Sequence, residues 1–261
     1  MNVDLVGKNA LVCGSSKGIG RAIAVELASL GANVIVAARS ADLLAEIVTK
    51  LPNSVAQNHG FLVIDMEDHE DLIKKVRTLA MTKTIHILIN NSGGPPGGPI
   101  LDAQPDEFSK AMKRHLIANH HLVNLLSPGM KKANYGRIIN IISTSVKEPI
   151  AGLGVSNTTR GAVASWAKTV AMELAPYGIT VNNILPGFTR TERLESLIST
   201  WANQRSLTIS EMESELYQSV PMGRFASPEE VGAVAAFLAT PSASYVTGVS
   251  LAVDGGRTKC L

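Results

Sequence analysis

Short runs of β-branched residues alternate with longer stretches of helical periodicity along the chain. In residues 18–30, Ile19, Ile23, Leu27 and Leu30 recur at the spacing that places side chains on one face of a helix. The other stretches of this kind predict helices at 41–51, 68–81, 105–133 (with a bend), 157–175 and 228–239. The apolar runs between them predict strands at 10–14, 33–38, 61–64, 85–90, 136–142, 179–185 and 248–256.

This alternation predicts the fold class. Strands separated by helices pair in parallel through right-handed crossovers, and strongly apolar strands indicate a sheet covered on both faces. We therefore expect a doubly wound, Rossmann-type α/β fold with a parallel sheet of about seven strands, as a single domain over 1–261. Residues 188–222 interrupt the alternation, so we expect a mostly helical insertion there that closes over the substrate.

Composition narrows the class of protein without identifying it. The 261 residues are 45% hydrophobic, and 24 Lys and Arg against 22 Asp and Glu give a net charge of +2. This balance gives no reason to expect nucleic acid or an anionic membrane as a partner. Neither a signal peptide nor an apolar run of the ~18 residues that a membrane span needs is present. We expect a cytoplasmic protein and no metal site, because no Cys or His cluster has ligand spacing.

A glycine-rich turn, GSSKGIG at 14–20, joins the first strand to the first helix. Gly14 permits the tight turn, Gly18 lets the backbone approach a pyrophosphate, and Gly20 lets the helix pack closely on the sheet. The free N–H groups of the helix N-terminus favour the anion. The dinucleotide contacts predicted in this turn are Gly14, Ser16, Lys17, Gly18, Ile19 and Gly20.

The spacing Gly-x-x-x-Gly-x-Gly resembles the short-chain dehydrogenase/reductase family, and the resemblance runs from about residue 5 to 256. NNSG at 90–93 is similar to that family's Asn-Asn-Ala-Gly, and MGRF at 222–225 and VDGG at 253–256 are similar to its 3-oxoacyl-[acyl-carrier-protein] reductase branch. The resemblance implies carbonyl/alcohol interconversion on a small molecule by a homodimer or homotetramer. The cofactor contacts that it adds are Asp65, Asn91, Ser92, Gly93, Pro186, Gly187, Thr189 and Thr191.

The end of the second strand bears on the choice of cofactor. An acid there would bind the ribose 2′-OH of NAD, whereas a basic residue accommodates the 2′-phosphate of NADP. The chain has AARS at 37–40, with no acid, and Arg39 offers a planar fork that matches phosphate. Lys17 adds a second cation. We therefore expect NADP(H) rather than NAD(H), the alternative being that both cations are solvated surface charges.

The family resemblance implies four catalytic positions, normally Asn, Ser, Tyr and Lys. Counting along the motif places the serine at Ser143, the tyrosine position at Ser156, the lysine position at Arg160 and the asparagine position at His115. A serine hydroxyl is a much weaker acid than a phenol and is too short to take its place. An arginine, with a pKa above ~12, cannot readily pass on a proton.

Two hypotheses follow from these replacements. In the first, the protein is an NADP(H)-dependent oxidoreductase with a non-standard proton donor, and Ser143 still donates a hydrogen bond to the oxyanion. The donor could be His115, which could equally be a helix histidine bonded to the backbone, or Tyr217, which lies in the insertion. In the second, the protein is a catalytically silent dinucleotide-binding protein, either a redox sensor or a supporting subunit. A dehydration or isomerisation also remains open.

The pocket itself is predicted to be built by residues 92–99, 146–154 and 188–222. The first of these segments, SGGPPGGP, is rich in Gly and Pro, so we expect it to be ordered in advance of binding. None of the three carries a recognisable ligand signature, and the substrate cannot be derived from them.

Overall fold

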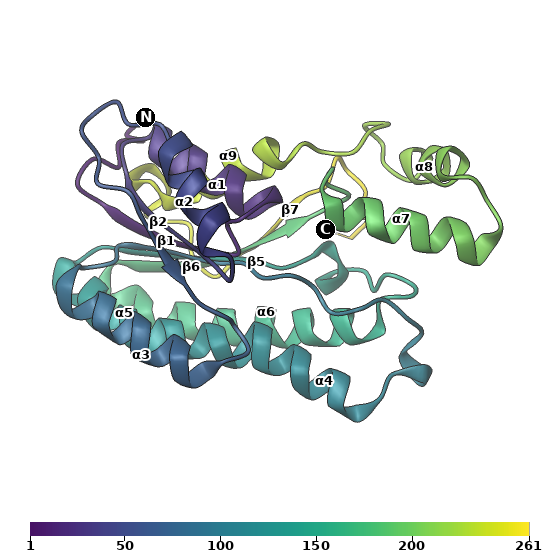
Figure 1. The fold of residues 1–261 in the computed structure, drawn as a ribbon, viewed down its shortest axis with the longest axis horizontal. Helices are drawn as coiled ribbons and strands as arrows, with labels where there is room; N and C mark the ends of the chain where they lie inside the picture. The colour runs from purple at the N-terminus through teal and green to yellow at the C-terminus, as the bar shows by residue number, and fades with distance from the viewer. Residues whose placement is uncertain (261) are drawn as a thin grey trace.

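A computed structural model, which describes residues 1–260, shows a parallel sheet between two layers of helices (Figure 1). The sheet has seven strands in the order β3-β2-β1-β4-β5-β6-β7. The strands are β1 (Asn9–Cys13), β2 (Asn33–Ala38), β3 (Gly60–Val63), β4 (Ile87–Asn90), β5 (Gly136–Ile141), β6 (Ile179–Pro186) and β7 (Ser250–Val253). The predicted doubly wound, single-domain α/β fold is confirmed.

Helices cover both faces of this sheet. One layer consists of α1 (Gly18–Ser29), α2 (Ala41–Lys50) and α9 (Pro228–Ala239). The other consists of α3 (His69–Thr82), α4 (Pro105–Met112), α5 (Ala118–Ala133) and α6 (Gly154–Leu174). The remaining two, α7 (Glu192–Arg205) and α8 (Ile209–Gln218), lie to one side of the sheet, at the right of Figure 1.

Alternation along the strands divides the core into two halves. In β1, Ala10 and Val12 pack with α1 and α9 residues on one face, whereas Leu11 and Cys13 pack with α3 and α5 residues on the other. Successive side chains of a strand point to opposite faces, so a strand covered on both sides must be apolar throughout. This is why the strands appear in the sequence as continuous apolar runs.

Three boundaries differ from the sequence-based expectation. The helix expected at 157–175 begins at Gly154, where a Cβ would lie 2.5 Å from the Cβ of Ile100, so glycine allows this close start. The bend expected within 105–133 is a π-helical segment, Lys113–Ile117, between α4 and α5. The strand expected at 248–256 contains only β7, because Gly255 and Gly256 have φ of +65° and +84°.

A row of polar side chains crosses strands β4 to β7 of the sheet. The Asn90 amide donates to Asn140 (2.8 Å), the Asn140 amide to Asn183 (2.9 Å), and the Asn183 amide to the hydroxyl of Ser250 (3.0 Å). Each is the direct neighbour of the next in the register of β4, β5, β6 and β7. The three asparagines are buried, so these hydrogen bonds satisfy amide groups that would otherwise be costly to remove from water, although the Oδ1 of Asn90 is buried without a partner.

Two kinds of feature are absent from the part of the chain that the structure describes. Within residues 1–260, no helix combines the length and the apolar character that crossing a bilayer demands. The same residues contain no group of three or more His, Cys, Asp or Glu side chains placed to hold a metal ion.

Candidate active site

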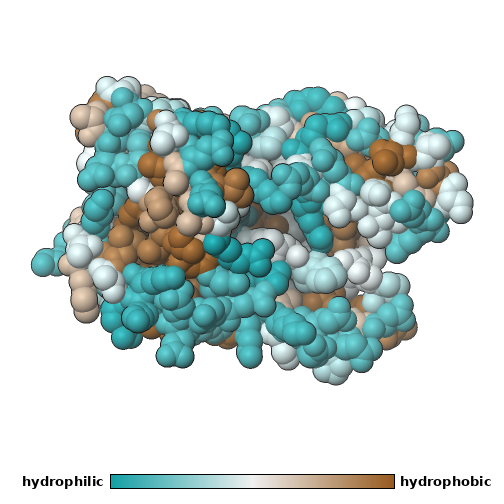
Figure 2. All heavy atoms as spheres, viewed as in Figure 1, coloured by the Kyte–Doolittle hydropathy of each residue, from teal (hydrophilic) through white to brown (hydrophobic). Residues whose placement is uncertain are grey.

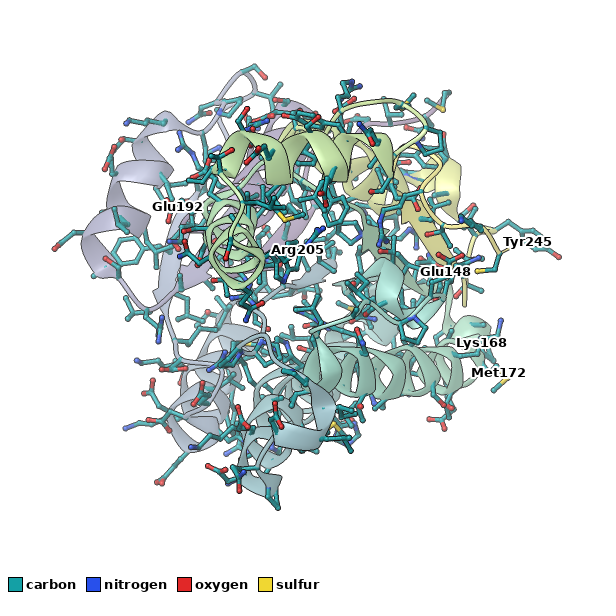
Figure 3. The ribbon with its side chains drawn as sticks, turned by 90° about the vertical axis from the view of Figure 1, so that its right-hand side faces the viewer. Glu148, Lys168, Met172, Glu192, Arg205 and Tyr245 are labelled. Carbon is teal, nitrogen blue, oxygen red and sulfur yellow. The ribbon has the colours of Figure 1, made fainter. Side chains whose placement is uncertain are left out.

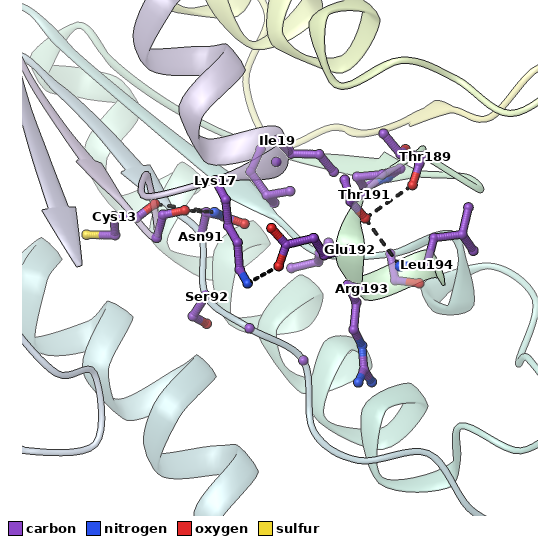
Figure 4. A pocket seen from close by; sticks show the side chains of 18 of the residues that line it. Cys13, Lys17, Ile19, Asn91, Ser92, Thr189, Thr191, Glu192, Arg193 and Leu194 are labelled. Atoms are coloured by element: carbon purple, nitrogen blue, oxygen red, sulfur yellow. Dashed lines mark hydrogen bonds and ion pairs between the residues drawn. The ribbon is translucent and has the colours of Figure 1, made fainter. Parts of the chain in front are cut away.

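A cavity of about 840 Å³ lies at the carboxyl ends of the central strands. Its walls come from the residues that follow β1 to β6 and from α6 and α7. The space-filling view shows the molecule hollowed between the body of the sheet and the α7–α8 side (Figure 2), and Figure 4 shows the cavity from close by. Strand order reverses between β1 and β4, which is where a doubly wound sheet binds its ligand.

The turn after β1 has the shape of a phosphate cradle. Gly14 has φ of +59°, and a Cβ there would lie 2.7 Å from the backbone oxygen of Asn91. The side-chain amide of Asn91 donates to the carbonyl of Gly14 (3.0 Å) and holds the turn against β4. No side chain caps the N-terminus of α1, and Gly18 and Ile19 of its first turn border the cavity. These residues therefore fit the pyrophosphate of a dinucleotide.

All but one of the residues predicted to contact the cofactor border this cavity. The exception is Gly20, which lies behind the turn, where a Cβ would collide with the carbonyl of Gly14. The predicted residues that border the cavity are Gly14, Ser16, Lys17, Gly18, Ile19, Arg39, Asp65, Asn91, Ser92, Gly93, Pro186, Gly187, Thr189 and Thr191.

The two cations expected at a 2′-phosphate differ in their surroundings. Arg39 reaches into solvent, with its side chain 79% exposed and Nη1 4.0 Å from the carboxylate of Asp65. Lys17 instead forms an ion pair with Glu192 at the start of α7 (Figure 4). Lys17 therefore joins the glycine turn to α7, and Arg39 at the end of β2 is the more exposed of the two cations.

Ser143, Ser156 and Arg160 line the same cavity. Ser143 begins a short 3₁₀ turn after β5, and its Oγ accepts a hydrogen bond from the backbone N–H of Ser145 (3.1 Å). Because that oxygen acts as an acceptor, its own proton remains free to be donated into the cavity. Ser156 and Arg160 lie one turn apart on α6, so both project from the same side of the helix.

Arg160 is a buried cation with little compensation. Its side chain leaves only 8% of the residue exposed, and Nη1 donates to the backbone oxygen of Ile141 (3.1 Å). Burial, followed by the positive charges of Arg193 and Arg114, lowers the pKa of Arg160 to about 10. The guanidinium therefore still carries its charge at neutral pH, inside the cavity wall.

His115 lies behind the cavity rather than in it. The residue is 2% exposed, and its Nδ1 is 2.7 Å from the Oγ of Ser92, while Nε2 is buried without a partner. Burial, followed by the nearby charges of Arg160 and Arg114, lowers the pKa of His115 to about 2. A neutral imidazole that does not border the cavity is poorly suited to donate a proton there, which argues against His115 as the acid.

Tyr217 does not reach the cavity either. Its hydroxyl accepts a hydrogen bond from Arg190 (2.5 Å), and its ring packs on Phe225 with 4.4 Å between centroids. In residues 1–260, no tyrosine borders the cavity. The donor expected from the insertion is therefore absent from the described site.

The outer wall of the cavity comes from two of the segments predicted to build it, 146–154 and 188–222, but its individual residues were not predicted. Arg193, Leu197 and Trp201 of α7 face the cavity, opposite Ile150 and Leu153. The loop over 92–99 is bound to the segment before α6, because the N–H of Gly98 donates to Gly152 (2.7 Å) and that of Gly154 to Gly98 (3.3 Å). The run RTER at 190–193, with two arginines inside the predicted insertion, was the available signal for Arg193.

Comparisons with known proteins identify the family. The family model described as "Enoyl-(Acyl carrier protein) reductase" matches residues 14–258. The chain belongs to the short-chain dehydrogenase/reductase family. It is 34% identical to the 3-oxoacyl-[acyl-carrier-protein] reductase FabG of Vibrio harveyi, over 97% of this chain and 98% of that protein.

Two further members of the family are similar over nearly their whole length. The NADPH-dependent reductase BacG of Bacillus subtilis is 29% identical, with 97% of this chain and 99% of that protein covered. The L-sorbose reductase of Gluconobacter frateurii, solved in complex with NADPH and L-sorbose, is 29% identical with a TM-score of 0.92, and both chains are covered completely. Members of the family are oxidoreductases, and the chain shares their fold throughout.

The low pKa of His115 predicts a pH effect on stability. The folded state holds the imidazole neutral down to about pH 2, whereas the ordinary pKa is 6.5, so below pH 6.5 the unfolded state binds more protons. His115 therefore stabilises the fold fully above pH 6.5 and progressively less in acid, with roughly 2 kcal/mol lost by pH 5. Urea unfolding of His115→Gln and of the unmodified protein between pH 5 and 8 should show a shallower decline for the variant.

The same assignment can be checked by NMR. The ring protons of His115 should show no titration between pH 5 and 8. A midpoint near pH 6.5 would instead place this imidazole in contact with solvent and restore it as a general acid.

Proposed function

We propose that this protein is an NADP(H)-dependent reductase of small carbonyl compounds in which Ser143 and Arg160 replace the family's phenol chemistry with electrostatic stabilisation. The observation that carries the proposal is that a hydroxyl and a buried guanidinium border the same cavity as an intact phosphate cradle. In many enzymes, hydrogen-bond donors and fixed charges directed at a developing oxyanion make the largest contribution to stabilising the transition state.

The cofactor end supports NADP(H). The glycine turn would hold the pyrophosphate and Arg39 the 2′-phosphate, because the end of β2 offers a guanidinium and no acid. Two solved relatives contain NADPH: the L-sorbose reductase of Gluconobacter frateurii and the actinorhodin polyketide ketoreductase. NADPH would supply a hydride from C4 of its nicotinamide ring.

The chain's own residues then act on the carbonyl oxygen. As the hydride adds to carbon, negative charge develops on oxygen, and the Ser143 hydroxyl donates a hydrogen bond to it. The Arg160 guanidinium lowers the energy of the same charge without giving up a proton. We propose that water supplies the proton through the Ser156 hydroxyl, which borders the cavity one turn from Arg160, so that the alcohol forms and hydroxide leaves to the solvent.

We also propose that the protein acts in the cytoplasm as a homodimer or homotetramer. Strand β7 pairs with β6 alone and lies at the end of the sheet. Near it, Tyr245 is fully exposed and Leu251 40% exposed, and Met172 on α6 is 63% exposed. Figure 3 shows Tyr245, Lys168 and Met172 along one side of the molecule. Exposed apolar side chains beside an open sheet edge are suited to cover by a second copy.

A silent, dinucleotide-binding function is the second candidate. It is favoured by one observation, that neither a tyrosine nor a protonated histidine borders the cavity within residues 1–260. In that case the fold would bind NADP(H) and respond to its redox state without turnover.

Replacing Ser143 tests the proposed reductase. Ser143→Ala should lower kcat by about 100-fold, because one oxyanion donor is lost, while NADPH binding is unchanged. The measurement is NADPH oxidation with a panel of ketones, aldehydes and 3-oxoacyl thioesters. Ser165→Ala is the matched control, since Ser165 is exposed on α6 and lies outside the cavity. Full activity in Ser143→Ala would contradict the proposed role.

Replacing Arg39 tests the cofactor. Arg39→Ala should raise the Kd for NADPH by roughly 10- to 100-fold and leave that for NADH nearly unchanged, because only the phosphate contact is lost. Calorimetric titration with each dinucleotide measures both constants. Arg77→Ala on α3, outside the cofactor cavity, serves as the control. An equal loss for both dinucleotides would argue against 2′-phosphate recognition by Arg39.

The double variant Ser156→Tyr, Arg160→Lys separates the two candidate functions. If the unmodified protein is silent, restoring the phenol and amine should create NADPH oxidation where none existed. If the reductase proposal is right, the unmodified protein already turns over, and the same carbonyl panel detects it. Measurable turnover by the unmodified protein would remove the silent candidate.

A further inference from the structure

The substrate end of the cavity carries positive charge that the protein does not neutralise. Three arginines border the cavity there without an ion pair among the described residues: Arg160, Arg193 and Arg257. Arg160 is more than nine-tenths buried and uses one N–H to bond a backbone oxygen, and the Nε of Arg257 is buried without a partner. A guanidinium has five N–H groups, so most of their donors remain available.

The carboxylates that border the same cavity are already engaged elsewhere. Asp65 lies beside Arg39, Glu67 is paired with Arg114, and Glu192 is paired with Lys17. Each of these pairs involves the glycine turn, the end of β2 or the loop after β3, at the cofactor end. The positive charge of the arginines at the substrate end is therefore not neutralised by the carboxylates that border the cavity.

Arg160 and Arg193 approach the same point from different helices. A Cβ built on Gly94 would lie 3.8 Å from the Nη2 of Arg160, on α6, and 3.8 Å from the Nη2 of Arg193, on α7. Arg193 also donates to the backbone oxygen of Pro95 (2.6 Å), which directs its side chain toward the loop after Ser92 (Figure 4). Two like charges that converge in a cavity repel each other unless an anion lies between them.

Beyond the arginines and the two serines, the outer wall of this end is apolar. Trp201 and Leu197 of α7 face Leu153 and Ile150, and the indole nitrogen of Trp201 lies 3.9 Å from a Cβ built on Gly152. A ligand that matches these walls has an anionic group at the two arginines and an apolar body against α7. Charged groups that fix orientation within a mostly apolar pocket are typical of small-molecule sites.

We propose that Arg193, together with Arg160, binds a carboxylate of the substrate, so that the protein reduces small oxo-acids in preference to neutral ketones. This inference rests on the proposed function and assigns its substrate class. In the reaction, the carbonyl carbon gains the hydride, its oxygen gains a proton, NADPH becomes NADP⁺, and the carboxylate is unchanged. A carboxylate offers two acceptor oxygens in one plane, which matches a guanidinium fork.

The test compares oxo-acids with their methyl esters on the protein loaded with NADP⁺. The probes are benzoylformate, benzoylacetate and 3-benzoylpropionate, in which the carboxylate moves stepwise away from the ketone. At least one acid should bind roughly 10-fold or more tightly than its ester, as quenching of Trp201 fluorescence or calorimetry measures. Arg193→Gln should raise the Kd of that acid by a similar factor and leave the ester unchanged, and Arg193→Lys should lie between.

The matched control is Arg205→Gln, on the same helix. Arg205 is paired with Glu215 and does not border the cavity, so this variant should bind acid and ester as the unmodified protein does. Esters that bind as tightly as every acid, or an equal effect of Arg193→Gln on both, would overturn the inference. Tighter binding of phenyl phosphate than of phenylacetate would also overturn it, because the anion would then be a phosphate.

The outcomes separate this inference from the reductase proposal. Acid binding through Arg193 without NADPH oxidation would support the carboxylate site and overturn the reductase. Turnover of esters at least as fast as acids would support the reductase and overturn the carboxylate site.

Discussion

The parallel pairing of β1 with β4 is the contact on which the site depends. The chain adds β2 and β3 on one side of β1 and then returns to add β4 to β7 on the other. The segments leaving β1 and β4 therefore turn toward opposite helix layers, and a crevice opens where they part. Asn91, directly after β4, closes the base of that crevice by bonding the Gly14 carbonyl. The glycine turn after β1 and the residues after β4 border one cavity because this pairing brings both strand ends to the same edge.

Arg160 is the most unusual group of the candidate site. In the family pattern a phenol and an amine share the work of proton transfer, and the sequence motif assigns those two positions to Ser156 and Arg160, which both lie on α6 and border the cavity. A buried guanidinium is costly to maintain without a counter-ion, and the structure shows no carboxylate paired with it among residues 1–260. An unpaired guanidinium is suited to a site that binds an anion, either a transient oxyanion, a substrate carboxylate or both.

The sequence predicted the alternation of strands and helices and a sheet covered on both faces, because periodicity is a local signal. It did not predict the strand order, and the grouping of Ser143, Ser156 and Arg160 came from the family resemblance. It did not predict the start of α6 at Gly154, since glycine disfavours helices and only the contact with Ile100 explains it. For His115 and Arg193, the sequence could not predict which way the side chain points. Whether a side chain faces a cavity or lies behind it depends on the π-helical segment and on how α7 packs, and neither leaves a periodic trace.

The asparagine row across β4 to β7 determines which residues can stand level with each other at the site. If β4 slid by a single position against β5, the buried amide of Asn90 would lie beside Ile139 or Ile141 instead of Asn140. Apolar strands alone tolerate such sliding far better, because one methyl group resembles another. The polar row thus fixes the register of β4, β5 and β6. That register sets the relative positions of Asn91, Ser143 and Pro186, which lie at the ends of these strands and border the cavity.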